Sequence, residues 1–131
     1  EARQLSGVYS LRKAANIIRA MGPQILIIKK GEHGALLFHE QNVFYAPALP
    51  LEEVFDPTGA GDTFAGGFMG YLAAAPQLDF ETMKRAIIAG SALASFCVEK
   101  FGTTRLLEIS HADLQQRMQE FVSLSTFQLE A

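Results

Sequence analysis

The segment from Asp56 to Phe64 holds the residues whose types and spacing could do chemistry. It reads Asp-Pro-Thr-Gly-Ala-Gly-Asp-Thr-Phe, a glycine-rich turn that leads into an apolar run with helical spacing. Amide N–H groups at a helix start have no partner inside the helix, and the helix dipole adds about half a positive charge there. Gly59, Ala60 and Gly61 carry little or no side chain, so an anion can approach these amides closely. The pattern therefore predicts a cradle for a phosphate or another oxyanion.

Asp62 places a carboxylate in the same turn. A carboxylate repels a phosphate and so is not there to bind it, but it can take a proton from a hydroxyl that attacks the phosphate. The alternative is that Asp62 only caps the helix, which ordinary capping preferences favour for a bare Gly-x-Gly-Asp. The segment is not a P-loop, because no Gly-Lys-Ser/Thr follows the glycines.

The elements that must position this turn begin with a helix and a hairpin. Apolar residues recur at helical spacing after Ser10, a plausible N-cap, and Gly22-Pro23 ends that helix. The continuous apolar run at 25–28 predicts a strand buried on both faces. A turn at 31–34 and a second strand at 35–38 predict its hairpin partner.

Two short strands and a helix follow the hairpin. We expect short strands at 43–46 and 54–56, the second stopped by Pro57. The helix at 61–75 is apolar nearly all round, which predicts a buried helix. Its glycines are poor helix formers that each destabilise a helix by about 1 kcal/mol, so we expect close packing to offset this cost. They are Gly66, Gly67 and Gly70.

Two further helices complete an α/β domain in which strands precede a packed helical layer. One covers about 80–100, with an inward stripe made of Met83, Ile87, Ile88, Ala92 and Phe96. The last starts at Ser110, and Asp113 three residues later gives a capping-box signature.

Composition bounds the class of protein. A length of 131 residues without linker or repeat predicts one domain, or part of one. The net charge of −3 gives no reason to expect nucleic acid or an anionic membrane as partner. Cys97 stands alone in an apolar run, which excludes a disulfide framework, indicates a core residue and favours the reducing cytoplasm. No apolar stretch is long enough to span a bilayer. Because the chain starts at Glu1 without Met, we expect it to be cut from something longer.

The segment 56–68 resembles the C-terminal signature of PfkB-family carbohydrate kinases. The likeness extends over nearly the whole chain: 29–34 is similar to the family's strand-turn segment beside the nucleotide, and 91–102 to the helix and turn that flank the adenine. The segment 1–7 resembles the end of the family's Asn-x-x-Glu motif, with Glu1 as its glutamate. The resemblance implies that 1–131 is the C-terminal, ATP-binding part of a ribokinase-like Rossmann-type α/β/α sandwich.

The resemblance also implies roles for individual residues. The aspartate that matches Asp62 deprotonates the acceptor hydroxyl, while the amides that match Gly59-Ala60-Gly61 stabilise charge on the transferring phosphoryl group. The glutamate that matches Glu1 helps to place Mg²⁺ through water. The residues that match Asp56 and Thr58 contribute in some members to a site for a monovalent cation such as K⁺. The implied reaction moves the γ-phosphoryl group of ATP to a hydroxyl of a sugar or nucleoside.

The remaining candidates for nucleotide contact each have a simpler alternative. Lys29 ends a strand and could reach the ATP phosphates or be a solvated lysine. Gly31 and Gly34 are turn residues that could also touch the nucleotide. The resemblance adds Thr58 as a further cofactor contact, and its adenine-flanking segment adds Gly102 and Ser91; Ser91 stands where some relatives carry an adenine-contacting Asn. Arg105 could approach the nucleotide, but we expect a surface role.

Three functions compete for this sequence. The first is a kinase acting on a small sugar or nucleoside. The second is a nucleotide-binding module without turnover, because in this family the acceptor is held mainly by an N-terminal half that this chain lacks. The third is a structural piece whose exposed sheet edge favours self-association, which would make a homo-oligomer.

Overall fold

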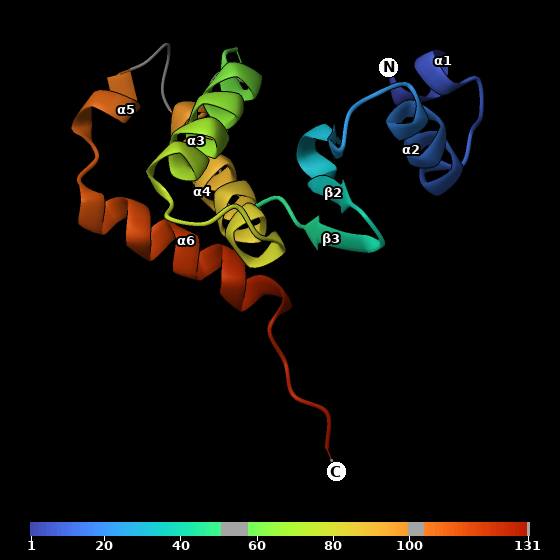
Figure 1. The fold of residues 1–131 in the computed structure, drawn as a ribbon. Coiled ribbons are helices and arrows are strands. Elements are labelled where there is room, and N and C mark those ends of the chain that lie inside the picture. Colours follow the sequence, from blue (N-terminus) through green and yellow to red (C-terminus); the bar gives the residue numbers. More distant parts are fainter. Residues whose placement is uncertain (51–57, 100–103, 131) are drawn as a thin grey trace. The chain divides into compact units, whose positions relative to one another are not determined.

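The computed structural model describes residues 1–50, 58–99 and 104–130. The predicted strand at 54–56 lies outside these ranges, and so do Asp56 and Gly102. The chain forms two compact units, Glu1–Tyr45 and Ala46–Ala131, which are called the first and second unit below. Figure 1 colours the first unit in blue to cyan and most of the second in green to red.

The first unit opens with two helices, α1 (Ala2–Ser6) and α2 (Leu11–Ala20). The side chain of Ser10 accepts a hydrogen bond from the amide of Lys13, so the predicted N-cap of α2 is confirmed. The buried face of α2 consists of Ala14, Ala15 and Ile18. The two alanines on this face let the helix lie close to the sheet that follows.

That sheet has three strands in the order β1-β2-β3. They are β1 (Ile25–Lys29), β2 (Ala35–His39) and β3 (Asn42–Ala46), with the short 3-10 helix η1 (Gly31–His33) between the first two. Strands β1 and β2 pair antiparallel with Ile27 opposite Leu37, which confirms the predicted hairpin. A cluster of Ala15, Ile28 and Phe38 joins α2 to the sheet.

The burial predicted for the first strand is wrong. Only Ile28 of β1 is buried, while its three preceding residues are partly exposed. In the described part of the chain β1 pairs with β2 alone and is therefore an end strand. A continuous apolar run indicates a strand whose two faces are both suited to burial. It does not show that other residues of this chain pack against both faces.

The second unit is built around α4 (Phe80–Cys97). Helix α3 (Ala60–Ala74) packs along it, α6 (His111–Ser125) crosses it, and the short α5 (Thr104–Glu108) joins α4 to α6 (Figure 1). All five residues predicted for the inward stripe of α4 are buried. No helix in the ranges that the structure describes is both long and apolar enough to cross a membrane.

Helix α3 is not buried all round, which corrects the prediction. Its buried residues are Phe64 and Phe68, whose rings stack with centroids 6.4 Å apart, whereas Met69 is 61% exposed. Close packing offsets the glycine at Gly67, but a Cβ added at Gly66 or Gly70 would meet no atom within 4 Å. The one-sided burial still fixes which face of α3 lies against α4.

Two side-chain caps fix the starts of the other long helices in this unit. The Asp79 carboxylate accepts a hydrogen bond of 2.8 Å from the amide of Thr82 at the start of α4. Ser110 and Asp113 form the predicted reciprocal capping box at the start of α6. These backbone hydrogen bonds to the ionised form lower the pKa of Asp79 and of Asp113.

Candidate active site

The start of α3 is a helix N-terminus formed by small residues and, among the residues described, without a side-chain cap. Gly59 is the N-cap residue and lies in the left-handed region (φ 83°, ψ −4°), a conformation that glycine adopts without steric cost. The carbonyl of Gly59 accepts the first helical hydrogen bond, 2.9 Å from the amide of Thr63. Since no side chain caps this helix, the first-turn amides of Ala60 and Gly61 lack a side-chain acceptor in the described part of the chain. This is the arrangement in which helix amides bind an anion.

Asp62 lies within the first turn of α3 and is exposed. Its carboxylate is therefore accessible to a hydroxyl that approaches from solvent, as a general base must be. The alternative function, an N-cap, falls in this structure to Gly59 instead. A carboxylate in the first turn also interacts favourably with the helix dipole.

Helix α4 supports the loop that precedes this turn. The Cys97 thiol donates to the carbonyl of Thr58 at 3.8 Å, and a Cβ added at Gly59 would lie 3.9 Å from the same sulfur. Cys97 is buried, as predicted for a core residue, but its position below the turn was not predicted. Cys97 and Thr58 are 39 positions apart, and the sequence carries no signal for a contact between them.

Two predicted residues of the first unit share a groove of about 960 Å³. Glu1 at the start of α1 and Lys29 at the end of β1 both line it, together with Lys30. Gly31 and Gly34 have φ of 57° and 90°, as turn residues after β1. The structure thus brings one carboxylate and two ammonium groups to one groove at the carboxyl end of β1.

The other predicted contacts lie in the second unit. Thr58 is exposed at the loop before α3, and Ser91 is half-buried in the middle of α4. Arg105 is more than a surface residue: its guanidinium lies 3.7 Å from carboxylate oxygens of both Glu99 and Glu108 and over the ring of Phe96. In the described ranges, no group of three His, Cys, Asp or Glu side chains could hold a metal ion.

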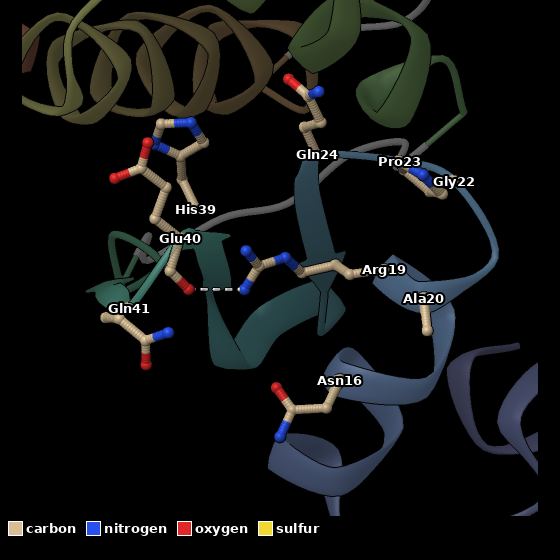
Figure 2. Close-up of a pocket in the computed structure, with 9 residues that line it drawn as sticks. All are labelled: Asn16, Arg19, Ala20, Gly22, Pro23, Gln24, His39, Glu40 and Gln41. Atoms are coloured by element: carbon tan, nitrogen blue, oxygen red, sulfur yellow. Dashed lines mark hydrogen bonds between the residues drawn. The ribbon is translucent and has the colours of Figure 1, made fainter.

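A separate pocket of about 590 Å³ lies in the first unit and contains no predicted site residue. It is lined by the end of α2, the start of β1 and the turn between β2 and β3 (Figure 2). Arg19 crosses the pocket and donates to the carbonyl of Glu40 at 2.7 Å. Glu40 has a φ of 54°, so this bond stabilises a strained turn. We interpret the pocket as a result of the hydrogen bond by which Arg19 holds the turn between β2 and β3.

The sequence matches the pfkB family carbohydrate kinases over residues 1–110. It is 36% identical over 107 residues to the aminoimidazole riboside kinase of Salmonella typhimurium, covering 82% of this chain and 33% of that protein. It is 40% identical over 79 residues to the cytidine kinase of Thermococcus kodakarensis, covering 58% of this chain and 28% of that protein. The chain therefore spans about a third of the length of these relatives.

Solved structures resemble this chain over most of its length. The aminoimidazole riboside kinase of Salmonella enterica, complexed with aminoimidazole riboside and an ATP analog, is 31% identical with a TM-score of 0.73, over 95% of this chain and 39% of that one. The ribokinase of Thermotoga maritima has a TM-score of 0.72 at 24% identity, over 90% of this chain and 38% of that one. The second likeness shows the fold alone, which is the predicted ribokinase-like α/β fold.

Proposed function

This chain belongs to the pfkB family of carbohydrate kinases, and from that membership we propose that it carries the phosphoryl-transfer end of an ATP-dependent kinase. The acceptor is a hydroxyl of a sugar or nucleoside. The single observation that carries the proposal is the start of α3, where amides that no described side chain caps and the exposed carboxylate of Asp62 share one helical turn.

In the proposed reaction Asp62 takes the proton of the acceptor hydroxyl as its oxygen bonds to the γ-phosphorus of ATP. The bond between that phosphorus and the β–γ bridging oxygen breaks, and ADP leaves with the electron pair. The amides of Gly59, Ala60 and Gly61 stabilise the charge on the transferring group, which is the main need of phosphoryl transfer. The loop has no side chain large enough to block this approach.

Cation and nucleotide contacts are assigned to the remaining predicted residues. Glu1 is exposed and lines the same groove as Lys29, so a hydrated Mg²⁺ and the ATP phosphates suit the charges present there. Bound Mg²⁺ would neutralise charge on the phosphate oxygens. We assign the phosphates to Lys29, Gly31 and Gly34, and a monovalent cation such as K⁺ to Thr58 with Asp56, which lies outside the described residues.

Two further observations suggest which acceptors to test and which cellular compartment suits the chain. Relatives named cytidine kinase, aminoimidazole riboside kinase and nucleoside kinase make ribosides the first acceptors to test. The single buried thiol of Cys97 favours a reducing compartment such as the cytoplasm.

The decisive test replaces Asp62 by Asn in the gene-encoded protein. The change keeps the size of the side chain and removes the base, so kcat should fall at least ~100-fold while ATP affinity is retained. Steady-state kinetics with a riboside acceptor and calorimetry with ATP and Mg²⁺ measure the two quantities. Glu81→Gln is the matched control, because Glu81 is an exposed first-turn carboxylate on α4, and it should leave kcat unchanged. Full turnover in Asp62→Asn would remove the proposed role.

The second candidate is a nucleotide-binding module without turnover. It is favoured by the length of the chain, which is about a third of its relatives. Calorimetry on the 131-residue chain separates the two candidates. Binding of ATP with no phosphorylated riboside would support the binding module for this chain, whereas product formation would exclude it.

A further inference from the structure

Two glycines, Gly67 and Gly90, meet where α3 and α4 cross. We propose that Gly90 is a positioning residue for the proposed phosphoryl-transfer turn: its missing side chain sets the depth at which α3, and with it Asp62, lies on α4. The inference rests on the proposed function.

Gly90 faces the backbone of α3 directly. A Cβ at this position would meet the carbonyl oxygen of Phe64 at 2.6 Å and the amide nitrogen of Phe68 at 3.2 Å. Residues 64 and 68 are four apart, so their carbonyl and amide are partners in one helical hydrogen bond of α3. An added methyl group would press on that hydrogen bond, where the backbone cannot rotate away as a side chain could.

The contact is reciprocal. A Cβ at Gly67 would lie 2.9 Å from the Cα of Gly90 and 2.8 Å from a terminal carbon of Leu93. The two helices therefore touch backbone to backbone at this crossing, and α3 can approach α4 no further. Real Cβ contacts below 3.0 Å are essentially never seen, so a methyl group at Gly90 requires α3 to move.

A displacement of Phe64 would also displace Asp62, because both residues lie at the start of α3. Phe64 is two residues after Asp62 and one after Thr63, whose amide closes the first turn on Gly59. Toward its C-terminal end, α4 also contacts the preceding loop through Cys97 and Thr58. Helix α4 thus contacts both the loop at Thr58 and the first residues of α3. Gly90 sets the distance between α4 and this part of α3.

The size of the effect follows from the distances. Ordinary van der Waals contact begins at 3.4 Å, so the methyl group of Gly90→Ala would displace α3 by roughly 1 Å in a close-packed interior. A displacement of that size at a reacting group can cost on the order of 100-fold in rate. The phosphate contacts proposed in the first unit and the candidate adenine contact Ser91 on α4 do not lie on α3, so the loss should fall on kcat and spare ATP binding.

The test measures Gly90→Ala and Gly66→Ala in the gene-encoded protein. Gly66→Ala is the matched control, because it removes a glycine from α3 at a position where a Cβ meets no atom within 4 Å. We expect Gly90→Ala to lower kcat by about 10- to 100-fold, with the Kd for ATP within about threefold of the wild-type value by calorimetry. Gly66→Ala should keep kcat and show an equal or higher Tm.

A folded Gly90→Ala protein with wild-type kcat would overturn the proposal, as would equal losses of kcat in both variants. If Gly90→Ala does not fold, Gly67→Ala replaces it. The side chain of Leu93 can yield there, and the backbone contact that remains, 2.9 Å to the Cα of Gly90, requires a smaller shift than the 2.6 Å contact at Gly90. That variant should show the same preference for kcat over ATP binding, and a loss of Tm alone would refute the inference. Asp62→Asn, measured in parallel, reports separately on the proposed function.

Discussion

At the scale of single residues, the Asp79 carboxylate shows how one side chain makes stability depend on pH. Its hydrogen bond with the amide of Thr82 is the main reason why its pKa lies below the ordinary value of 3.8, and the charge of Arg85 adds to the effect. A pKa that is lowered by folding stabilises the folded state above the unfolded value, and this contribution is lost as the pH falls through the folded value. The loss is therefore expected below about pH 4.

Replacing Asp79 by Asn isolates this contribution, because Asn also accepts the capping hydrogen bond but does not titrate. We expect Asp79→Asn and the wild type to unfold at similar urea concentrations at neutral pH. Below about pH 4 the wild type should lose stability that the variant keeps. Asp79→Ala, which lacks the cap, should be less stable than both at neutral pH. Parallel acid curves for the wild type and Asp79→Asn would contradict the assignment.

Single residues were predictable from the sequence where their role is local. Gly59 and Asp62 stand within one turn, and the geometry of a helix start follows from the order of the residues. From another helix, Cys97 contacts the loop at Thr58 and Gly90 contacts α3 at Phe64 and Phe68. Nothing in the residue types of the sequence pairs positions so far apart. Their roles became visible only when α3 and α4 were in place.

At the scale of elements, Arg117 fastens α6 to the end of α4. Its guanidinium donates to Ser95 Oγ at 2.8 Å, lies 2.7 Å from a carboxylate oxygen of Glu99, and stacks 4.0 Å from the centre of the Phe96 ring. The side chain of Arg117 is only 13% exposed, so its partners are shielded from water on this side. Such charge-assisted bonds are stronger than neutral ones.

Arg117→Met keeps the apolar stem and removes the guanidinium. Ser95 and Glu99 then lose their contacts with Arg117, although Arg105 remains 3.7 Å from Glu99, so the free energy of unfolding should fall by about 1–3 kcal/mol. Urea unfolding followed by far-UV circular dichroism measures the change. Arg12→Met, an exposed arginine on α2, is the control and should change stability by less than about 0.5 kcal/mol. Equal effects in the two variants would show that the network contributes nothing to stability.

The same elements show what sequence patterns can and cannot predict. The Ser10 cap, the hairpin and the Ser110–Asp113 box depend on neighbouring residues, and all three are confirmed. The burial of β1 and α3 depends on partners elsewhere, and both predictions are wrong. Helix α5 was not predicted, because five residues with one arginine and two leucines give too short a pattern.

At the scale of the whole molecule, the predicted site residues fall into two groups that follow the two units. Glu1, Lys29, Gly31 and Gly34 belong to the first, while Thr58, the turn at 59–62 and Ser91 belong to the second. The family signature could be recognised from the second group alone, because it is continuous in sequence. Residues of the first group are separated in sequence, and the structure brings two of them, Glu1 and Lys29, to one groove.

The first unit also determines how the 131-residue chain should behave in solution. Its end strand β1 is apolar along Ile25–Ile28, and the groove beside it is lined by Leu5, Leu11, Ile18 and Leu26. In the described ranges β1 pairs with one strand only, and an apolar edge strand is a template for pairing with a second copy. We therefore expect this chain to self-associate, with a mass that rises with concentration across about 1–100 µM.

Light scattering after size-exclusion chromatography measures that mass against 14.3 kDa for one chain. Ile27→Lys places a charge in the middle of β1, a device by which natural edge strands avoid pairing, and should shift the chain toward the monomer. Met69→Lys makes the same type of change at an exposed apolar residue of α3 and should leave association unchanged. If only Met69→Lys restored the monomer, the contact would lie on α3, whereas a wild-type chain that stays monomeric throughout would show that the edge of β1 is already protected.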